Sequence, residues 1–130
     1  MKSKDSLIRV KQFQVTERHK QVNQLETMIA EFERMATELE MQIENEERKS
    51  GITDVNHFAY PTFAKAARTR RDNLMNSIKD LQTQKEQAET ALMEAEAELQ
   101  KAEKLDVREA RKAAEEQAAK RAYDRQAMIG

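Results

Sequence analysis

Residues 50–61 read SGITDVNHFAYP and interrupt a chain that is otherwise rich in helix-forming residues. This segment contains Gly51 and Pro61, the two helix-breaking residues in the interior of the chain. Glycine accepts the left-handed conformation that ends a helix, and proline is well tolerated in the first turn of the next one. The sequence therefore predicts a first helix over residues 5–49, a loop over residues 50–61 and a second helix over residues 62–128.

The composition favours the same fold class. The 130 residues include two glycines and one proline, whereas an average protein has about 7% glycine and about 5% proline. A sandwich, a barrel or a doubly wound sheet needs many more turn residues than this chain supplies. Ala, Glu, Lys, Gln, Arg, Leu and Met dominate and are the strongest helix formers. We predict an all-α fold in which residues 1–130 form one hairpin of two long antiparallel helices.

Both expected helices carry mainly apolar residues at the seven-residue spacing of a coiled coil. Each helix has two such series of positions, which we call core columns because they should face the other helix. The columns of the first helix are Ile8, Val15, Val22, Ile29, Ala36, Ile43 and Lys11, Arg18, Leu25, Phe32, Leu39, Glu46. The columns of the second helix are Ala64, Arg71, Ile78, Lys85, Leu92, Leu99 and Ala67, Leu74, Leu81, Ala88, Ala95, Ala102. Because a short connection favours antiparallel neighbours, residues that face each other should have numbers that add up to about 110.

The second helix is longer than the first in this register. Asp5 pairs with a residue near Leu105, so residues beyond about 107 have no facing partner in the hairpin. This last segment is rich in alanine and charged residues and lacks an apolar stripe. An isolated helix of that kind is marginal in water. We therefore expect it to fray or to dock onto another molecule.

Two basic residues occupy core columns near the open end of the hairpin. The register places Lys11 opposite Leu99 and Arg18 opposite Leu92, where their aliphatic stems can cover a leucine while their charges stay in water. A chain selected only for its own stability would carry leucine at both positions. We therefore predict a partner-binding surface at this end, and its candidate residues are Arg9, Lys11, Arg18, Lys20, Arg108, Arg111 and Lys112.

The loop end of the hairpin is the second candidate surface. Its candidate contact residues are His57, Phe58, Tyr60, Phe63, Arg68 and Arg71. The aromatic residues can anchor a partner, or they can plug the end of the hairpin against Ile43, Ile52 and Ala64. The basic residues Lys65, Arg68, Arg70 and Arg71 can bind an acidic partner. They can equally be counter-charges for the acidic residues of the first helix, Glu38, Glu40, Glu44, Glu46 and Glu47.

Other classes of function find little support in the sequence. There is no cysteine, the two histidines His19 and His57 fall on different elements, and two glycines cannot build a phosphate-binding loop. We expect no catalytic site, no metal site, no cofactor and no small-molecule substrate. The net charge of −1 argues against nucleic acid as a partner. The chain lacks an apolar run long enough to span a membrane and an apolar segment typical of a secretory signal.

Several segments resemble the FliJ family of bacterial flagellar export proteins, and more narrowly its alphaproteobacterial branch. These segments are SLIRVKQFQV at 6–15, IAEFERM at 29–35, GITD at 51–54 and HFAYPTFAKA at 57–66. The resemblance covers roughly residues 1–105. The loop segment is its most specific part, because no heptad requires that sequence.

The resemblance implies a cytoplasmic helical hairpin similar to the central stalk of rotary ATPases. Proteins of this family insert their open end into the hexamer of the flagellar export ATPase and promote its assembly and activity. They also contact the cytoplasmic domain of the membrane export gate protein and handle export chaperones, which implies peripheral association with the inner membrane. The alternatives from other classes are a structural coiled coil that dimerises or forms filaments, and a chaperone for secreted substrates.

Overall fold

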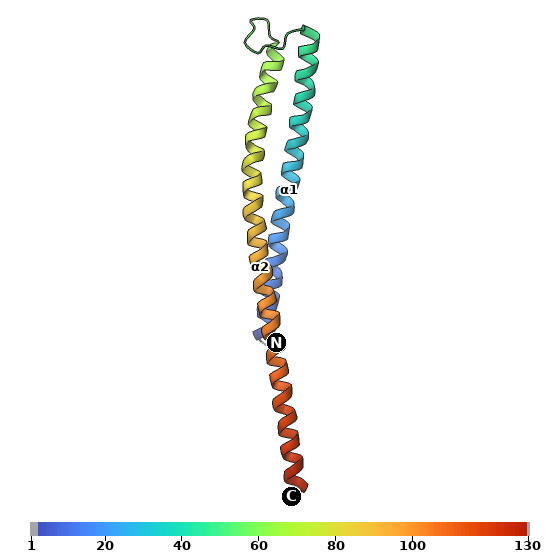
Figure 1. Cartoon of the computed structure of the whole chain (residues 1–130), viewed down its shortest axis with the longest axis vertical. Helices are drawn as coiled ribbons and strands as arrows, with labels where there is room; N and C mark the ends of the chain where they lie inside the picture. Colours follow the sequence, from blue (N-terminus) through green and yellow to red (C-terminus); the bar gives the residue numbers. More distant parts are fainter. Residues whose placement is uncertain (1–2, 130) are drawn as a thin grey trace. The chain divides into compact units, whose positions relative to one another are not determined.

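The computed structural model describes residues 3–129, with side chains from residue 5 onward, and consists of two α-helices and a loop. Helix α1 spans Ser3–Ser50 and helix α2 spans Thr62–Ile129. The two helices pack against each other in opposite directions on either side of the loop, as Figure 1 shows. The predicted all-α antiparallel hairpin is therefore confirmed.

The described residues fall into two compact units, and each contains part of both helices. Residues 19–90 form one of them, which we call the loop unit because it contains the loop. Residues 3–18 and 91–129 form the other, which we call the tail unit because it contains the end of α2. In both units, a segment of α1 lies alongside a segment of α2 (Figure 1).

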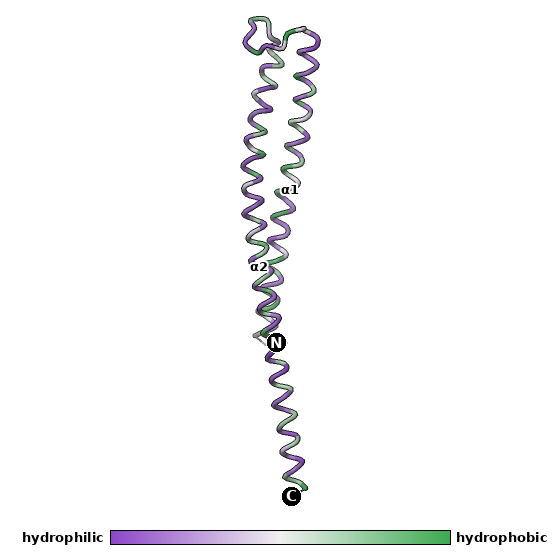
Figure 2. The backbone as a smooth tube through the Cα atoms, viewed as in Figure 1, coloured by the Kyte–Doolittle hydropathy of each residue, from purple (hydrophilic) through white to green (hydrophobic). Residues whose placement is uncertain are grey.

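The core of the loop unit is a single seam of side chains between the two helices. The buried residues that belong to the predicted columns are Val22, Leu25, Ile29, Ala36, Ile43, Ala64, Ala67, Ile78, Leu81 and Ala88. Ile43 retains 2% of its exposure and Ala64 retains none. Figure 2 shows how apolar and polar residues alternate along both helices, as expected for helices with one buried stripe. The heptads thus correctly predict which faces pack together.

Ion pairs between the helices confirm the predicted register. Arg71 binds Glu40, and Lys85 Nζ lies 3.6 Å from Glu26 Oε1 in the loop unit. In the tail unit, Lys11 Nζ lies 2.7 Å from Glu98 Oε2. The residue numbers in each of these three pairs add up to within one of the predicted value, and those of the fourth pair, Glu47 with Arg68 at the loop end, exceed it by five.

The loop begins with a glycine cap. Gly51 has a φ of 73°, and its N–H donates to the carbonyl oxygen of Glu47 at 2.8 Å. This is the left-handed conformation that closes a helix and that other residues adopt at a cost. The Asn56 N–H then donates to Asp54 Oδ1 at 3.0 Å, in a turn typical of aspartate. The Lys65 N–H donates to the Pro61 carbonyl oxygen at 3.0 Å, where α2 begins.

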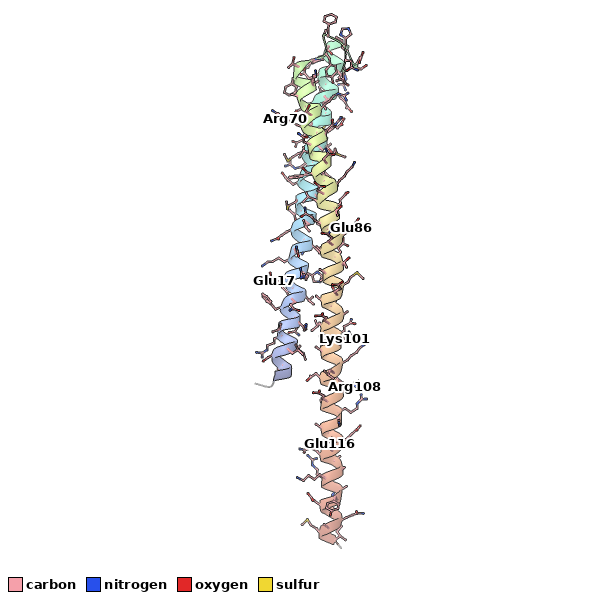
Figure 3. All side chains as sticks on the ribbon, turned by 90° about the vertical axis from the view of Figure 1, so that its left-hand side faces the viewer. Glu17, Arg70, Glu86, Lys101, Arg108 and Glu116 are labelled. Atoms are coloured by element: carbon pink, nitrogen blue, oxygen red, sulfur yellow. The ribbon has the colours of Figure 1, made fainter. Side chains whose placement is uncertain are left out.

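In the tail unit, α2 continues past the part of the seam that α1 covers. Ala95 is buried, and Ile8, Val15 and Leu99 are half-buried. Every residue from 110 to 129 is exposed. Figure 3 shows Glu116 on a stretch of α2 that no described part of α1 accompanies.

Candidate functional site

A polar network ties the end of α1 to the loop and to the start of α2. The Tyr60 hydroxyl donates to Glu47 Oε2 at 2.8 Å, and Arg68 Nη2 donates to the same oxygen at 2.8 Å. Arg68 Nε also donates to the Tyr60 hydroxyl oxygen at 2.8 Å. Tyr60 retains 7% of its exposure, and the Arg68 guanidinium carbon lies 5.9 Å from the centre of its ring. Tyr60 therefore plugs the loop end, as one of the two interpretations of the aromatic residues requires.

The network favours the ionised forms of Glu47 and Arg68. Hydrogen bonds from Arg68, and then from the Tyr60 hydroxyl, lower the pKa of Glu47 below its ordinary value. The bond to Glu47 in turn raises the pKa of Arg68. Charge-assisted hydrogen bonds of this kind are stronger than neutral ones. Tyr60 and Arg68 were predicted to contact a partner. Their hydrogen bonds in the structure are instead with Glu47 and with each other, inside the loop unit.

Arg71 is also engaged within the loop unit. It binds Glu40 on α1, and its Nη2 lies 3.0 Å from Asp72 Oδ1 on its own helix. The bond to Glu40 is the main reason that the pKa of Arg71 is raised. The interpretation of the basic cluster as counter-charges for the acidic face of α1 is therefore confirmed for Arg68 and Arg71.

Three of the predicted loop-end residues face solvent. Phe58 is 96% exposed, and its ring stacks on that of His57 with 4.8 Å between centroids. His57 Nδ1 accepts a hydrogen bond from the Ala59 N–H at 3.0 Å, which fixes the position of the imidazole. Phe63, in the first turn of α2, is 53% exposed. His57, Phe58 and Phe63 are therefore the loop-end residues available to a partner.

The basic residues predicted at the open end divide between the two units. Lys20 belongs to the loop unit, and the remaining residues belong to the tail unit, namely Arg9, Lys11, Arg18, Arg108, Arg111 and Lys112. Lys11 keeps 24% of its side-chain exposure, and its ammonium group lowers the pKa of Glu98 through a hydrogen bond. Arg18 is exposed although it occupies a core column. Glu98 was missed from the sequence, although it lies next to Leu99, the residue expected to face Lys11.

The basic residues of the late part of α2 lie on the surface of this one helix. Arg108 and Arg111 lie beside Val107 around one open depression of that surface. The same two arginines and Lys112 line a second one. The three residues are exposed and follow the spacing that keeps side chains on adjacent parts of a helix surface. This surface can contact acidic side chains of a partner through several positive charges at once.

A groove on one flank of the loop unit was not predicted from the sequence. Its volume is about 400 Å³, and the side chains that line it are Met35, Glu38, Leu39, Gln42, Arg70, Asn73 and Leu74. Met28 and Met35 could have indicated it, because they recur at the seven-residue spacing directly beside the core-column residues Ile29 and Ala36. Arg70 projects from α2 near the loop end of the helix, as Figure 3 shows.

The described part of the chain has neither a metal-binding cluster nor a membrane-spanning helix. Among the described residues, no group of three or more histidine, aspartate or glutamate side chains is arranged to hold a metal ion. Within residues 3–129, neither helix contains a segment long and apolar enough to cross a membrane. Comparisons with protein-family models, curated proteins and solved structures return no match to this chain.

Proposed function

We propose that this chain is the stalk-like adaptor of a bacterial flagellar protein export apparatus, in the manner of the FliJ proteins. In this function the basic end of the hairpin enters the export ATPase hexamer and promotes its activity. The remainder links the ATPase to the cytoplasmic domain of the export gate protein and to export chaperones. The protein is then cytoplasmic and associates with the inner membrane only through the export apparatus.

The sequence of residues 51–66 is the observation that carries this proposal. A heptad explains the helices of any coiled coil, but it does not require GITD at 51–54 or HFAYPTFAKA at 57–66. These are the residues that most resemble the family. An antiparallel two-helix hairpin is also the architecture that the resemblance implies, and this chain has it.

The half-buried Lys11 gives the proposal additional support. A lysine in a core column costs stability relative to leucine, and such costs are often retained where a residue serves specificity. In this column the Lys11 ammonium group pairs with Glu98 at 2.7 Å. Arg108, Arg111 and Lys112 add exposed charge to the same unit. A stalk that rests against the inner wall of a ring needs side chains of this type.

The test is affinity capture from lysate of the source cell with the tagged full chain. We expect the export ATPase and the export gate protein to be retained, and the purified ATPase to hydrolyse ATP faster when the chain is added. Retention of the chain alone, or of cytoskeletal coiled coils, would overturn the proposal. The matched control is a tagged hairpin in which Arg108, Arg111 and Lys112 are replaced by glutamate, which should lose the ATPase.

A further inference from the structure

The two flanks of the seam in the loop unit differ in charge. One flank carries ion pairs between the helices, which join Glu26 to Lys85, Glu40 to Arg71 and Glu47 to Arg68. On the opposite flank, the residues of the loop unit that immediately precede the first-listed column of each helix are Gln21, Met28, Met35, Gln42, Phe63, Arg70, Ser77 and Gln84. We call this set the neutral flank, because Arg70 is its single charged member.

Flanking positions of a solvent-facing coiled coil are usually charged. The neutral flank instead combines methionine, glutamine, serine and phenylalanine with one arginine. Met28 is 44% exposed and Met35 is 38% exposed. Interface cores are depleted of lysine and glutamate and enriched in methionine and arginine. The neutral flank therefore has the composition of a surface that is covered in an assembly.

The 400 Å³ groove described above lies on this flank. Met35, Leu39 and Leu74 give it an apolar lining, with Glu38 on α1 and Arg70 on α2 at its sides. Arg70 forms no ion pair with any residue that the structure describes. Glu38 accepts a bond from Arg34 Nη1 at 2.9 Å through Oε1, so Oε2 can accept a second donor.

We propose that the loop unit associates with a second copy of this chain through the neutral flank. A two-fold interface uses the same surface on both copies, so every contact occurs twice. A two-fold axis that runs through the groove parallel to the helices places α2 of one copy on α1 of the other, and therefore Arg70 against the partner's Glu38. The same rotation brings the apolar linings of the two grooves together. The result is a four-helix arrangement of two hairpins.

The size of the flank predicts a weak dimer. Residues 21–42 of α1 extend for about 32 Å at about 1.5 Å per residue. Two adjacent helices are about 20 Å wide, which gives about 600 Å² per copy. Standard interfaces bury about 800 Å² per partner. We therefore expect reversible association that depends on protein concentration.

The test is analytical ultracentrifugation of the full chain from low micromolar to near-millimolar concentration. We expect the average mass to rise reversibly from 15.1 kDa toward that of a dimer. Arg70→Glu and Glu38→Arg should each weaken association at least tenfold, because like charges then face each other across the axis. An equimolar mixture of the two variants should restore it, because opposite charges face each other again in the mixed dimer.

The control for the charge change is Lys79→Glu, which alters an exposed lysine away from the neutral flank and should leave association unchanged. Circular dichroism of each variant verifies that the hairpin is folded. A chain that stays monomeric over the whole concentration range overturns the proposal, even if another protein binds this flank. It is also overturned if Arg70→Glu has no effect, or if the mixed variants fail to associate.

Discussion

Among single residues, Glu47 joins three segments of the loop unit. It receives hydrogen bonds from Tyr60 in the loop and from Arg68 on α2, and its own backbone carbonyl accepts the Gly51 N–H. Glu47 lies beside a core column, where glutamate is ordinary, so its sequence position predicts an ion pair at most. The sequence gives no indication of the Tyr60 hydroxyl as a third member, because a heptad does not determine where a loop side chain points.

The lowered pKa of Glu47 predicts how stability depends on pH. The unfolded chain binds a proton at Glu47 more readily than the folded chain does. The contribution of Glu47 is therefore present above the ordinary carboxyl pKa and is lost as pH falls through the folded value. Thermal unfolding followed by circular dichroism from neutral to acidic pH should show a smaller fall in Tm for Glu47→Gln than for the natural chain.

The same substitution should lower Tm at neutral pH, because Arg68 then loses the carboxylate to which it donates. Glu44→Gln is the matched control, since Glu44 is an exposed residue of the same helix. If Tm depended on pH in the same way for Glu47→Gln as for the natural chain, Glu47 would contribute nothing to the pH dependence of stability.

Ile43 is the most deeply buried large side chain of the seam, with 2% exposure. Ile43→Ala should destabilise the hairpin by about 2–4 kcal/mol, because it removes buried methyl groups and leaves a cavity opposite Ala67, which is itself small. Met41→Ala, at a position 59% exposed, should cost far less. Urea unfolding of the two variants measures the difference, and equal losses would contradict the register.

At the scale of elements, the helices and the position of the loop could be predicted from the sequence, whereas the placement of the loop side chains could not. The two heptads predicted the buried faces and the register, since apolar spacing and a short connection constrain both. The loop has no such period. Phe58 and Tyr60 are both aromatic and two residues apart, yet Phe58 is exposed and Tyr60 is buried. The difference is the hydroxyl of Tyr60, which finds partners at the end of the seam.

The junction between α1 and the loop depends on the backbone of Gly51. A Cβ at this position would meet no atom within 4 Å, but the φ of 73° disfavours any residue with a side chain. Gly51→Ala should therefore cost about 1 kcal/mol through backbone strain alone. Gly51→Asn should cost less, because asparagine tolerates this conformation better. Urea unfolding of both variants tests the order, and an alanine variant as stable as the natural chain would contradict it.

At the scale of the whole molecule, we expect the basic residues of the core columns to lower the stability of the hairpin while they contribute to the proposed function. Replacing both Lys11 and Arg18 with leucine should stabilise the hairpin by about 1 kcal/mol through burial of apolar surface, and mainly at Lys11, because Arg18 is exposed. Under the function proposed above, the same double variant should stimulate the export ATPase less than the natural chain does. Tm and ATP hydrolysis by the purified ATPase are the two measurements.

Lys79→Leu is the control for this double variant, because it removes an exposed lysine that lies outside the core columns. Its ATPase stimulation should equal that of the natural chain. Normal stimulation by the double variant would show that the basic residues of the core columns are not part of the ATPase contact.

The antiparallel register also fixes an order of assembly. Ile43 and Ala67 are close in the chain, whereas Ile8 and Ala102 are separated by most of it. Closing a short loop costs less entropy than closing a long one, so pairing should start next to residues 50–61 and proceed toward the chain ends. During synthesis, the apolar column of α1 emerges long before the residues that cover it. A nascent chain therefore exposes Val22, Leu25 and Ile29 until the second half of the seam has been translated.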